Sequence, residues 1–257
     1  MDLGLDGRVV IATGATSGLG RATAEALVAE GARLVVCSRD PDRVAATVAE
    51  LGDERAVGVA ADLTDDDTPA RLIAAARDTF GRLDGLFVSH GGPPAGPAED
   101  LSDADLDRAL ALAARAPIRL VRDVTAELGA GGAVLVLTST SSVEPIAGLA
   151  SSNLTRTSVW GYCRTLADEV APRGVRVNLV LPGRFATDRL AELHASVADR
   201  TGRTPDEVRD AAAAAIPLRR IGDPAELGRV AAFLLSPAAS YVTGCAWRVD
   251  GGAVTGL

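Results

Sequence analysis

Short apolar runs alternate with longer stretches of helical periodicity along the whole chain. A short run rich in Val, Ile, Leu and Ala is typical of a strand buried on both faces of a parallel sheet, and apolar residues recurring every three or four positions indicate a helix. The runs predict seven strands, at Arg8–Thr13, Arg33–Cys37, Ala56–Ala60, Gly85–Ser89, Ala133–Thr138, Val175–Val180 and Cys245–Val249.

The stretches between the strands predict helices, several of which open with Asp, Ser or Pro, as helix starts commonly do. They lie near Gly18–Glu30, Pro41–Leu51, Asp67–Phe80, Asp103–Leu128, Ser152–Ala171 and Pro224–Leu235. This alternation is typical of an α/β fold, a Rossmann-type doubly wound parallel sheet of seven strands with helices on both faces. Because no linker rich in Gly, Pro or Ser divides the chain, we expect residues 1–257 to form a single domain.

Residues 182–217 form the one long departure from this alternation. The segment begins where a strand ends, at the edge of a doubly wound sheet where ligands bind. We therefore expect a substrate lid at about residues 183–217. A pair of surface helices without a role in binding would give the same pattern.

Composition and charge narrow the range of partners. The formal net charge is −8, which argues against nucleic acid or an anionic membrane as a partner, because both need a basic surface. Cys37, Cys163 and Cys245 are scattered, so neither a disulfide framework nor a metal site is indicated. The first residues lack a signal segment, and no run approaches the ~20 apolar residues that cross a bilayer. We expect a cytoplasmic protein that acts on a small molecule.

A glycine-rich turn joins the first predicted strand to the first predicted helix. Glycine allows the backbone to turn sharply and to approach a pyrophosphate, while the free N–H groups of the helix favour negative charge. The strand and helix that this mechanism needs flank the turn, so we expect a dinucleotide-binding domain. The residues expected to bind the cofactor here are Gly14, Thr16, Ser17, Gly18, Leu19 and Gly20.

The turn, TGATSGLG, resembles the TGxxxGxG loop of the classical short-chain dehydrogenase/reductase family. The resemblance covers nearly the whole length of the chain, and within the family it is to the 3-oxoacyl-carrier-protein reductases. It implies that Asp62, followed by Leu63, contacts adenine. It also implies that Pro182-Gly183 and Thr187 meet the pyrophosphate and the nicotinamide carboxamide. The closing segment YVTGCAWRVDGG is similar to the last strand of the family. Family members commonly pair through the fourth and fifth helices, which implies a homo-oligomer, a dimer or a tetramer.

The end of the second strand indicates which nicotinamide cofactor is bound. An acidic residue there would bind the adenosine ribose and repel a 2′-phosphate, but the chain has Ser38 and Arg39. Arginine binds phosphate bidentately, so NADP(H) is favoured over NAD(H). Arg39 as a solvated loop charge is the alternative.

The catalytic positions depart from the family. The family reaction uses a Ser, a Tyr and a Lys with a supporting Asn. By the resemblance of flanking residues, Ser139 matches the Ser, Ser152 stands in place of the Tyr, Arg156 in place of the Lys, and Ala113 in place of the Asn. No shift of register restores the Lys, because all 26 basic residues are arginine.

The substituted residues predict a changed mechanism. Ser152 and Arg156 are four positions apart on one helix, so both can face a nicotinamide. Neither is a good proton donor at pH 7. We expect Arg156 to stabilise a developing alkoxide and to hold the ribose, with Ser139 and Ser152 hydrogen-bonding the carbonyl oxygen and water supplying the proton. The alternative is that Arg156 reflects a general preference for arginine in this chain.

The family motif NNAG after the fourth strand is here Val88-Ser89-His90-Gly91, and Ser89 and Gly91 are expected to contact the cofactor. His90 lies close to the expected cofactor, at a position where the family mainly uses its backbone, and we expect the same here. A proton relay by its side chain near neutral pH is the alternative. We expect a surface role for His194, in the lid segment, rather than a substrate contact.

Two functions follow. The first is an NADP(H)-dependent ketone or 3-oxoacyl-type reductase that works with Ser139, Ser152 and Arg156. The second keeps the fold and the cofactor pocket without redox turnover, either for a non-redox reaction or as an inactive partner subunit. Intact cofactor residues favour the first, and the loss of Tyr, Lys and Asn favours the second.

Overall fold

The computed structural model describes residues 2–256 and contains one parallel sheet. Its strands lie side by side in the order β3-β2-β1-β4-β5-β6-β7. They are β1 (Val9–Thr13), β2 (Arg33–Ser38), β3 (Ala56–Ala60), β4 (Gly85–Val88), β5 (Ala133–Leu137), β6 (Arg176–Pro182) and β7 (Ala246–Val249). The predicted fold class and the seven strands are confirmed. The direction of strand addition reverses between β1 and β4, which in such sheets places the ligand crevice at the carboxyl ends of these strands.

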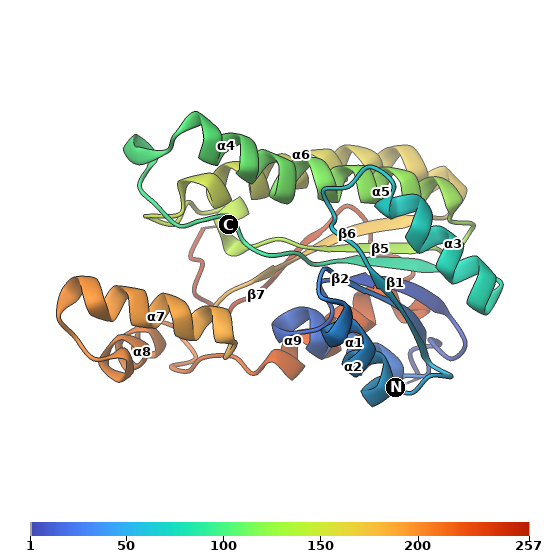
Figure 1. Cartoon of the computed structure of the whole chain (residues 1–257), viewed down its shortest axis with the longest axis horizontal. Coiled ribbons are helices and arrows are strands. Elements are labelled where there is room, and N and C mark those ends of the chain that lie inside the picture. Colours follow the sequence, from blue (N-terminus) through green and yellow to red (C-terminus); the bar gives the residue numbers. More distant parts are fainter. Residues whose placement is uncertain (1, 257) are drawn as a thin grey trace.

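Helices cover both faces of the sheet (Figure 1). One face carries α1 (Gly18–Ala29), α2 (Pro41–Leu51) and α9 (Pro224–Leu235), and the other carries α3 (Thr68–Phe80), α5 (Ala116–Glu127) and α6 (Ala150–Val170). Within residues 2–256, no helix combines the length and the apolar character needed to cross a membrane.

The strands supply both cores because successive side chains point to opposite faces. Val9 and Ile11 pack among the helices of the α3 face, whereas Val10 and Ala12 pack on the α1 face. Side chains buried on both faces explain why the strands appear in the sequence as continuous apolar runs.

The predicted helix Asp103–Leu128 is interrupted. It forms α4 (Asp103–Leu110), a π-helical segment at Ala111–Arg115, and then α5. Pro117 lies in the first turn of α5. A proline has no N–H to donate to the carbonyl four residues earlier, and its ring clashes with that carbonyl, so the helix widens just before it. Ala113, at the position of the family Asn, is fully buried in this segment.

The segment expected to be a lid contains two helices, α7 (Asp188–Thr201) and α8 (Pro205–Ala214), which pack against each other as a hairpin. The hairpin projects from the main body on the side where β6 ends (Figure 1). At its base, Phe185 and Gly222 form a parallel β-bridge, in which the Ala186 N–H donates to the Gly222 carbonyl at 2.9 Å. Two short chain segments, paired at this bridge, therefore connect the hairpin to the rest of the protein. Its action as a lid stays a prediction.

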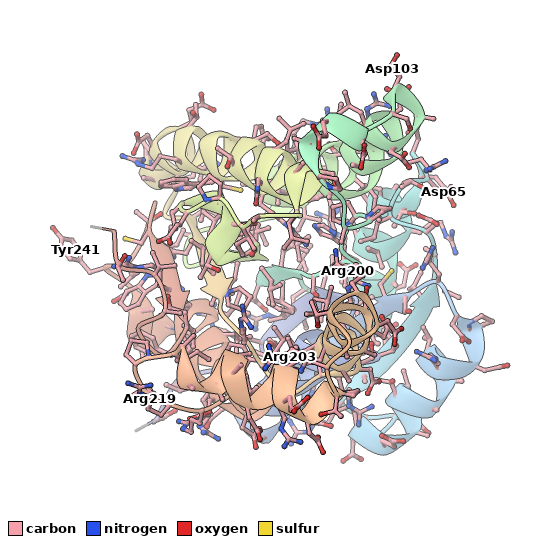
Figure 2. The ribbon with its side chains drawn as sticks, turned by 90° about the vertical axis from the view of Figure 1, so that its left-hand side faces the viewer. Asp65, Asp103, Arg200, Arg203, Arg219 and Tyr241 are labelled. Atoms are coloured by element: carbon pink, nitrogen blue, oxygen red, sulfur yellow. The ribbon has the colours of Figure 1, made fainter. Side chains whose placement is uncertain are left out.

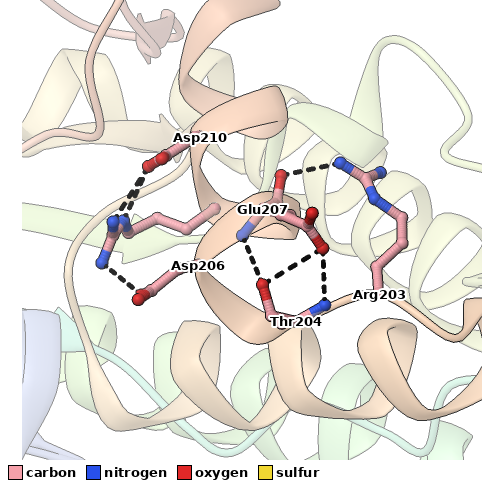
Figure 3. Close-up of polar contacts among 6 residues, drawn as sticks. Arg203, Thr204, Asp206, Glu207 and Asp210 are labelled. Atoms are coloured by element: carbon pink, nitrogen blue, oxygen red, sulfur yellow. Dashed lines mark hydrogen bonds and ion pairs between the residues drawn. The ribbon is translucent and has the colours of Figure 1, made fainter.

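The tip of the hairpin is fixed by side-chain hydrogen bonds (Figure 3). Thr204 Oγ1 accepts from the Glu207 N–H at 3.2 Å, and Glu207 Oε2 accepts from the Thr204 N–H at 2.8 Å, a reciprocal cap of α8. Arg203 Nη2 donates to the Glu207 carbonyl at 2.8 Å. Ion pairs of Arg209 with the neighbouring Asp206 and Asp210, at 2.7 and 3.0 Å, add to the same turn.

The surface role expected for His194 is wrong. His194 lies on α7 with only 8% of its area exposed, and its Nε2 atom is buried without a hydrogen-bond partner in residues 2–256. Burial, together with the charges of Arg184 and Arg209, lowers the pKa of His194. The packing of α7 against α8 shields the His194 ring from water. This packing joins separate helices, so no local sequence pattern predicts it.

Candidate active site

The turn between β1 and α1 depends on glycine at three positions. Gly14 and Gly18 adopt φ angles of +57° and +53°, in the left-handed region that glycine favours. A Cβ atom on Gly14 would lie 2.7 Å from the Ser89 carbonyl oxygen, and one on Gly20 would lie 2.0 Å from the Gly14 carbonyl oxygen. Thr13 Oγ1 donates to the Ser89 carbonyl at 2.8 Å and accepts from the Ser89 N–H at 3.1 Å. The turn is therefore packed directly against the end of β4.

The amino end of α1 is open. Ser17 is the N-cap residue, but its side chain makes no capping hydrogen bond with any residue in the described range 2–256. The N–H groups of Gly18, Leu19 and Gly20 point out of this end, where the helix dipole favours an anion. Side chains cap five other helices, α2, α4, α7, α8 and α9. Thr16 is half-buried beside this end, and Leu19 packs on the α1-face core.

Ser38 ends β2, and Arg39 follows it with an exposed side chain that forms no ion pair within residues 2–256. The next residue, Asp40, accepts the N–H groups of Asp42 and Arg43 at 3.0 and 3.1 Å and so caps α2. The acidic side chain at this strand end is thus committed to a helix cap. The guanidinium of Arg39 is free for a ligand.

Asp62 lies beyond the end of β3, near Arg39. Its Oδ1 atom accepts from the Thr64 N–H and from Thr64 Oγ1, both at 2.8 Å. These hydrogen bonds, led by the N–H of Thr64 and joined by the charge of Arg39, lower the pKa of the Asp62 carboxyl. Leu63 is partly buried against the core. The predicted adenosine-binding residues therefore gather at the carboxyl ends of β2 and β3.

The next predicted cofactor residues, Pro182-Gly183 and Thr187, lie at the end of β6 and after it, and Thr187 lies beside the glycine turn. A Cβ atom on Gly183 would lie 2.7 Å from Asp250 Cα, so only glycine fits there. Thr187 Oγ1 caps α7 by accepting from the Leu190 N–H at 3.3 Å. The Thr187 Cγ2 atom lies 3.5 Å from the position that a Cβ atom on Gly18 would take. Residues predicted from opposite ends of the chain are thus adjacent.

Ser139 and Ser152 both contact Ser141, Ser139 through the Ser141 N–H and Ser152 through the Ser141 hydroxyl. Ser139 follows β5, and its Oγ atom accepts from the Ser141 N–H at 3.1 Å. Ser152 lies in the first turn of α6, with its Oγ atom 3.4 Å from Ser141 Oγ. Ser141 is not among the residues predicted from the sequence, although the run of hydroxyl residues from Ser139 to Ser142 is a signal for it.

Arg156 lies one turn after Ser152 and is 95% buried, with 5% of its area exposed. Its Nη1 atom donates to His90 Nε2 at 2.8 Å and to the Leu137 carbonyl at 3.2 Å. Its Nε atom is buried without a partner, and no carboxylate pairs with it in residues 2–256. Burial lowers the pKa of Arg156 to about 10, so the guanidinium stays charged at neutral pH.

His90 is neutral in this arrangement. Its Nδ1 atom lies 2.7 Å from the Gly91 carbonyl oxygen. A guanidinium only donates hydrogen bonds, so Nε2 must be the acceptor and Nδ1 must carry the proton, which it donates to Gly91. Burial and the charge of Arg156 lower the pKa of His90 to about 3. A ring that holds one proton, already committed to Gly91, does not fit the proton relay considered from the sequence.

Buried polar atoms without partners concentrate beside these residues. Within residues 2–256, Thr138 Oγ1, Ser142 Oγ and Arg156 Nε are three of the five such side-chain atoms. Buried donors and acceptors are normally satisfied, so their gathering at the end of β5 marks a place where a ligand or ordered water binds. Within the same residues, no group of three or more His, Cys, Asp or Glu side chains could hold a metal ion.

A cavity of about 350 Å³ lies next to the hydroxyl residues. It is bounded by the loop Pro94–Pro97, by Leu101 and Asp105 at the start of α4, and by Ser151, whose Oγ donates to the Pro94 carbonyl at 2.9 Å. Figure 2 views the molecule from the side of the hairpin and shows Arg200 and Arg203 of the hairpin on the same side as Asp103 of α4. The hairpin and the start of α4 therefore lie on the same side of the molecule.

Known proteins resemble this chain over nearly its full length. A family model described as enoyl-(acyl carrier protein) reductase matches residues 14–254. The oxidoreductase MT0954 of Mycobacterium tuberculosis is 34% identical over 254 residues, which cover 96% of this chain and 92% of that protein. L-sorbose reductase from Gluconobacter frateurii, crystallised with NADPH and L-sorbose, aligns with a TM-score of 0.93 at 28% identity and covers 100% of both chains. Actinorhodin polyketide ketoreductase with NADPH aligns with a TM-score of 0.91 at 28% identity, over 97% of this chain and 98% of that one.

Proposed function

Because the chain belongs to the short-chain dehydrogenase/reductase family, we propose that it is an NADP(H)-dependent ketoreductase or 3-oxoacyl-type reductase whose catalytic residues are Ser139, Ser152 and Arg156. The observation that carries the proposal is the buried, unpaired guanidinium of Arg156 one helical turn from Ser152. A buried cation that no carboxylate neutralises suits the negative charge that develops on a carbonyl oxygen during reduction.

The residues present fit a nicotinamide dinucleotide. The open amino end of α1 and the positive-φ glycines Gly14 and Gly18 suit a pyrophosphate, and the unpartnered Nε of Arg156 suits a polar group at the nicotinamide end. Asp62 and Leu63 would hold adenine, and Ser89, Gly91 and the segment from Pro182 to Thr187 would line the rest of the cofactor. When bound, NADPH supplies a hydride to a carbonyl carbon.

The residues of the chain would then bind the carbonyl oxygen of the substrate and stabilise its negative charge. Ser139 and Ser152 donate hydrogen bonds to the carbonyl oxygen of the substrate, and Arg156 stabilises the charge on that oxygen from a site largely closed to water. No residue of this set gives up a proton at neutral pH, because two are alcohols and the third is a guanidinium. A water molecule that enters from solvent gives its proton to the alkoxide oxygen and returns to solvent as hydroxide, which bulk buffer neutralises.

The preference for NADPH rests on Arg39. Its guanidinium is free within residues 2–256, while the adjacent carboxylate of Asp40 caps α2. A 2′-phosphate at the end of β2 would meet this cation. Titration with NADPH and NADH tests the preference, and tighter binding of NADH would contradict it.

The substrate would enter between the hairpin and the cavity beside Ser151. We propose that residues 183–217 act as a lid on a small carbonyl or hydroxy substrate, within a single dinucleotide-binding domain. We further propose that the chain forms a homo-oligomer, a dimer or tetramer, through α4, α5 and α6. Size-exclusion chromatography with light scattering measures the number of copies.

The decisive experiment follows absorbance of the reduced nicotinamide with a panel of ketones and oxoacyl thioesters. Turnover that is lost in Arg156→Ala and kept in Arg164→Ala supports the proposal. Arg164 is the matched control because it lies on the same helix, exposed and paired with Asp168 at 2.6 Å. Turnover unchanged in Arg156→Ala would remove Arg156 from the mechanism.

The absence of Tyr, Lys and Asn from the catalytic positions favours a second function, a cofactor-binding protein without redox turnover. The fully buried methyl group of Ala113, where the family has Asn, is the structural feature behind it. NADPH binding without turnover on any substrate of the panel would select this function.

A further inference from the structure

The buried charge of Arg156 raises the question of what holds it in place. A guanidinium removed from water normally pairs with a carboxylate, because an unpaired buried charge is costly. Here both protein partners, the His90 ring and the Leu137 carbonyl, are neutral, and both are contacted by the same nitrogen, Nη1. Nε and Nη2 have no hydrogen-bond partner within residues 2–256.

From this contact we infer that His90 is a positioning residue, a neutral acceptor that fixes the Arg156 guanidinium by its Nη1 atom without cancelling its charge. The assignment rests on the 2.8 Å contact between Arg156 Nη1 and His90 Nε2, and on the 2.7 Å contact that commits His90 Nδ1–H to the Gly91 carbonyl. The second contact fixes both the tautomer and the plane of the ring. His90 touches no expected reacting atom itself and acts through Arg156.

A carboxylate at position 90 would hold Arg156 equally well, but it would neutralise the cation. Imidazole in its Nδ1–H form provides an acceptor of similar reach and no charge. The full positive charge of Arg156 is thus left for a ligand, with Nη2 and Nε as the remaining donors. This inference rests on the proposed function only in naming the nicotinamide end of NADPH and the carbonyl oxygen as the groups that receive those donors.

The test compares His90→Ala, His90→Gln and the isosteric but charged His90→Glu with the unmodified protein. Titration calorimetry measures the binding of NADPH and, separately, of 2′,5′-ADP, and ketone reduction is followed alongside. The proposed adenosine site lies at the ends of β2 and β3, separated from β5 by β1 and β4. The second ligand therefore does not reach Arg156 and reports on the fold and on the rest of the pocket.

We expect His90→Ala to weaken NADPH binding about 10-fold, the effect of losing the orientation of one charged hydrogen-bond donor, and to leave 2′,5′-ADP binding unchanged. His90→Gln offers an amide oxygen as a neutral acceptor, so it should keep both NADPH binding and kcat. His90→Glu has the same reach as His90→Gln and should keep NADPH binding, but it should lower kcat below that of His90→Gln, because its carboxylate neutralises Arg156.

Three results would overturn the inference. The first is an equal loss of both ligands in His90→Ala, which would indicate a local structural role. The second is wild-type behaviour of His90→Ala, and the third is equal kcat in His90→Glu and His90→Gln. A protein that binds NADPH but reduces no ketone contradicts the proposed function, while the comparison of NADPH with 2′,5′-ADP still decides the role of His90. Failure of the unmodified protein to bind NADPH would overturn both.

Discussion

Replacing Arg156 by methionine is expected to stabilise the folded chain while it abolishes turnover. Burial lowers the pKa of Arg156 to about 10, which corresponds to about 3 kcal/mol against the protonated side chain in the folded state. Methionine fills a similar volume without charge. It leaves His90 Nε2 and the Leu137 carbonyl without their donor, at about 1 kcal/mol each. The difference is a net gain of about 1 kcal/mol, or about 2–4 °C in Tm for a chain of this size.

The sign of the pH dependence follows from the same pKa. The unfolded chain binds the guanidinium proton more tightly than the folded chain, so the burial of Arg156 destabilises the protein fully below about pH 10. The destabilisation fades only as the pH rises toward the ordinary pKa of arginine. At pH 7 the whole difference between Arg156 and methionine should therefore be measurable.

Urea unfolding of the ligand-free protein at pH 7 is the assay, with Arg164→Met as the control for loss of an exposed arginine on the same helix. The control should change the free energy of unfolding by less than about 0.5 kcal/mol, because exposed ion pairs contribute little. A decrease in the stability of Arg156→Met by more than about 1 kcal/mol would refute the reasoning, since it would mean that the folded protein compensates the charge.

Three further predictions concern other parts of the site. The pKa of His90 is about 3 in the folded protein, so the unfolded chain binds the proton first and the free energy of unfolding falls as the pH drops from about 6.5 toward 3. The urea midpoint should therefore fall more between pH 7 and pH 5 in wild type than in His90→Gln. Equal falls in the two proteins would contradict the neutral ring. Arg39→Asp should weaken NADPH binding at least about 10-fold with NADH affinity kept or raised, because it replaces a phosphate-binding cation with a carboxylate; parallel titrations check this, and unchanged NADPH affinity would make Arg39 a solvated charge. Gly14→Ala should lose cofactor binding and more than about 2 kcal/mol of stability, because the new Cβ meets the Ser89 carbonyl at 2.7 Å and φ is +57°; thermal unfolding measures it against Gly161→Ala, where nothing lies within 4 Å of the added Cβ.

The sheet could be predicted from the sequence because its signals are local. Residues such as Val9 to Ala12 alternate between two cores, so each strand is apolar throughout. The end of the predicted Val175–Val180 strand was placed two residues short, since β6 continues through Leu181 and Pro182. Both residues are buried and continue the ladder to β7, a contact that depends on a segment more than sixty residues later.

The site was only partly predictable because its central contact is not local. Ser139, Ser152 and Arg156 can be placed by their flanking residues, and the structure brings the first two into contact with Ser141. The pairing of Arg156 with His90 joins positions 66 residues apart. The sequence shows only that position 90 has a titratable ring. The contacts of this ring with Arg156 Nη1 and with the Gly91 carbonyl show that its Nε2 atom is a hydrogen-bond acceptor. The burial of His194 escaped prediction for the same reason.

The reciprocal hydrogen bonds between Thr13 and Ser89 have a thermodynamic consequence. They join the side-chain hydroxyl of Thr13, the last residue of β1 before the glycine turn, to the backbone of Ser89, the residue directly before His90, and His90 accepts a hydrogen bond from Arg156. A displacement of the turn is thus transmitted through one peptide unit to the residue that contacts Arg156, the proposed catalytic cation. Coupling between two sites is reciprocal. A ligand that displaces the turn should therefore change the affinity of the Arg156 site for a second ligand, and that second ligand should change the affinity of the turn for the first by the same factor.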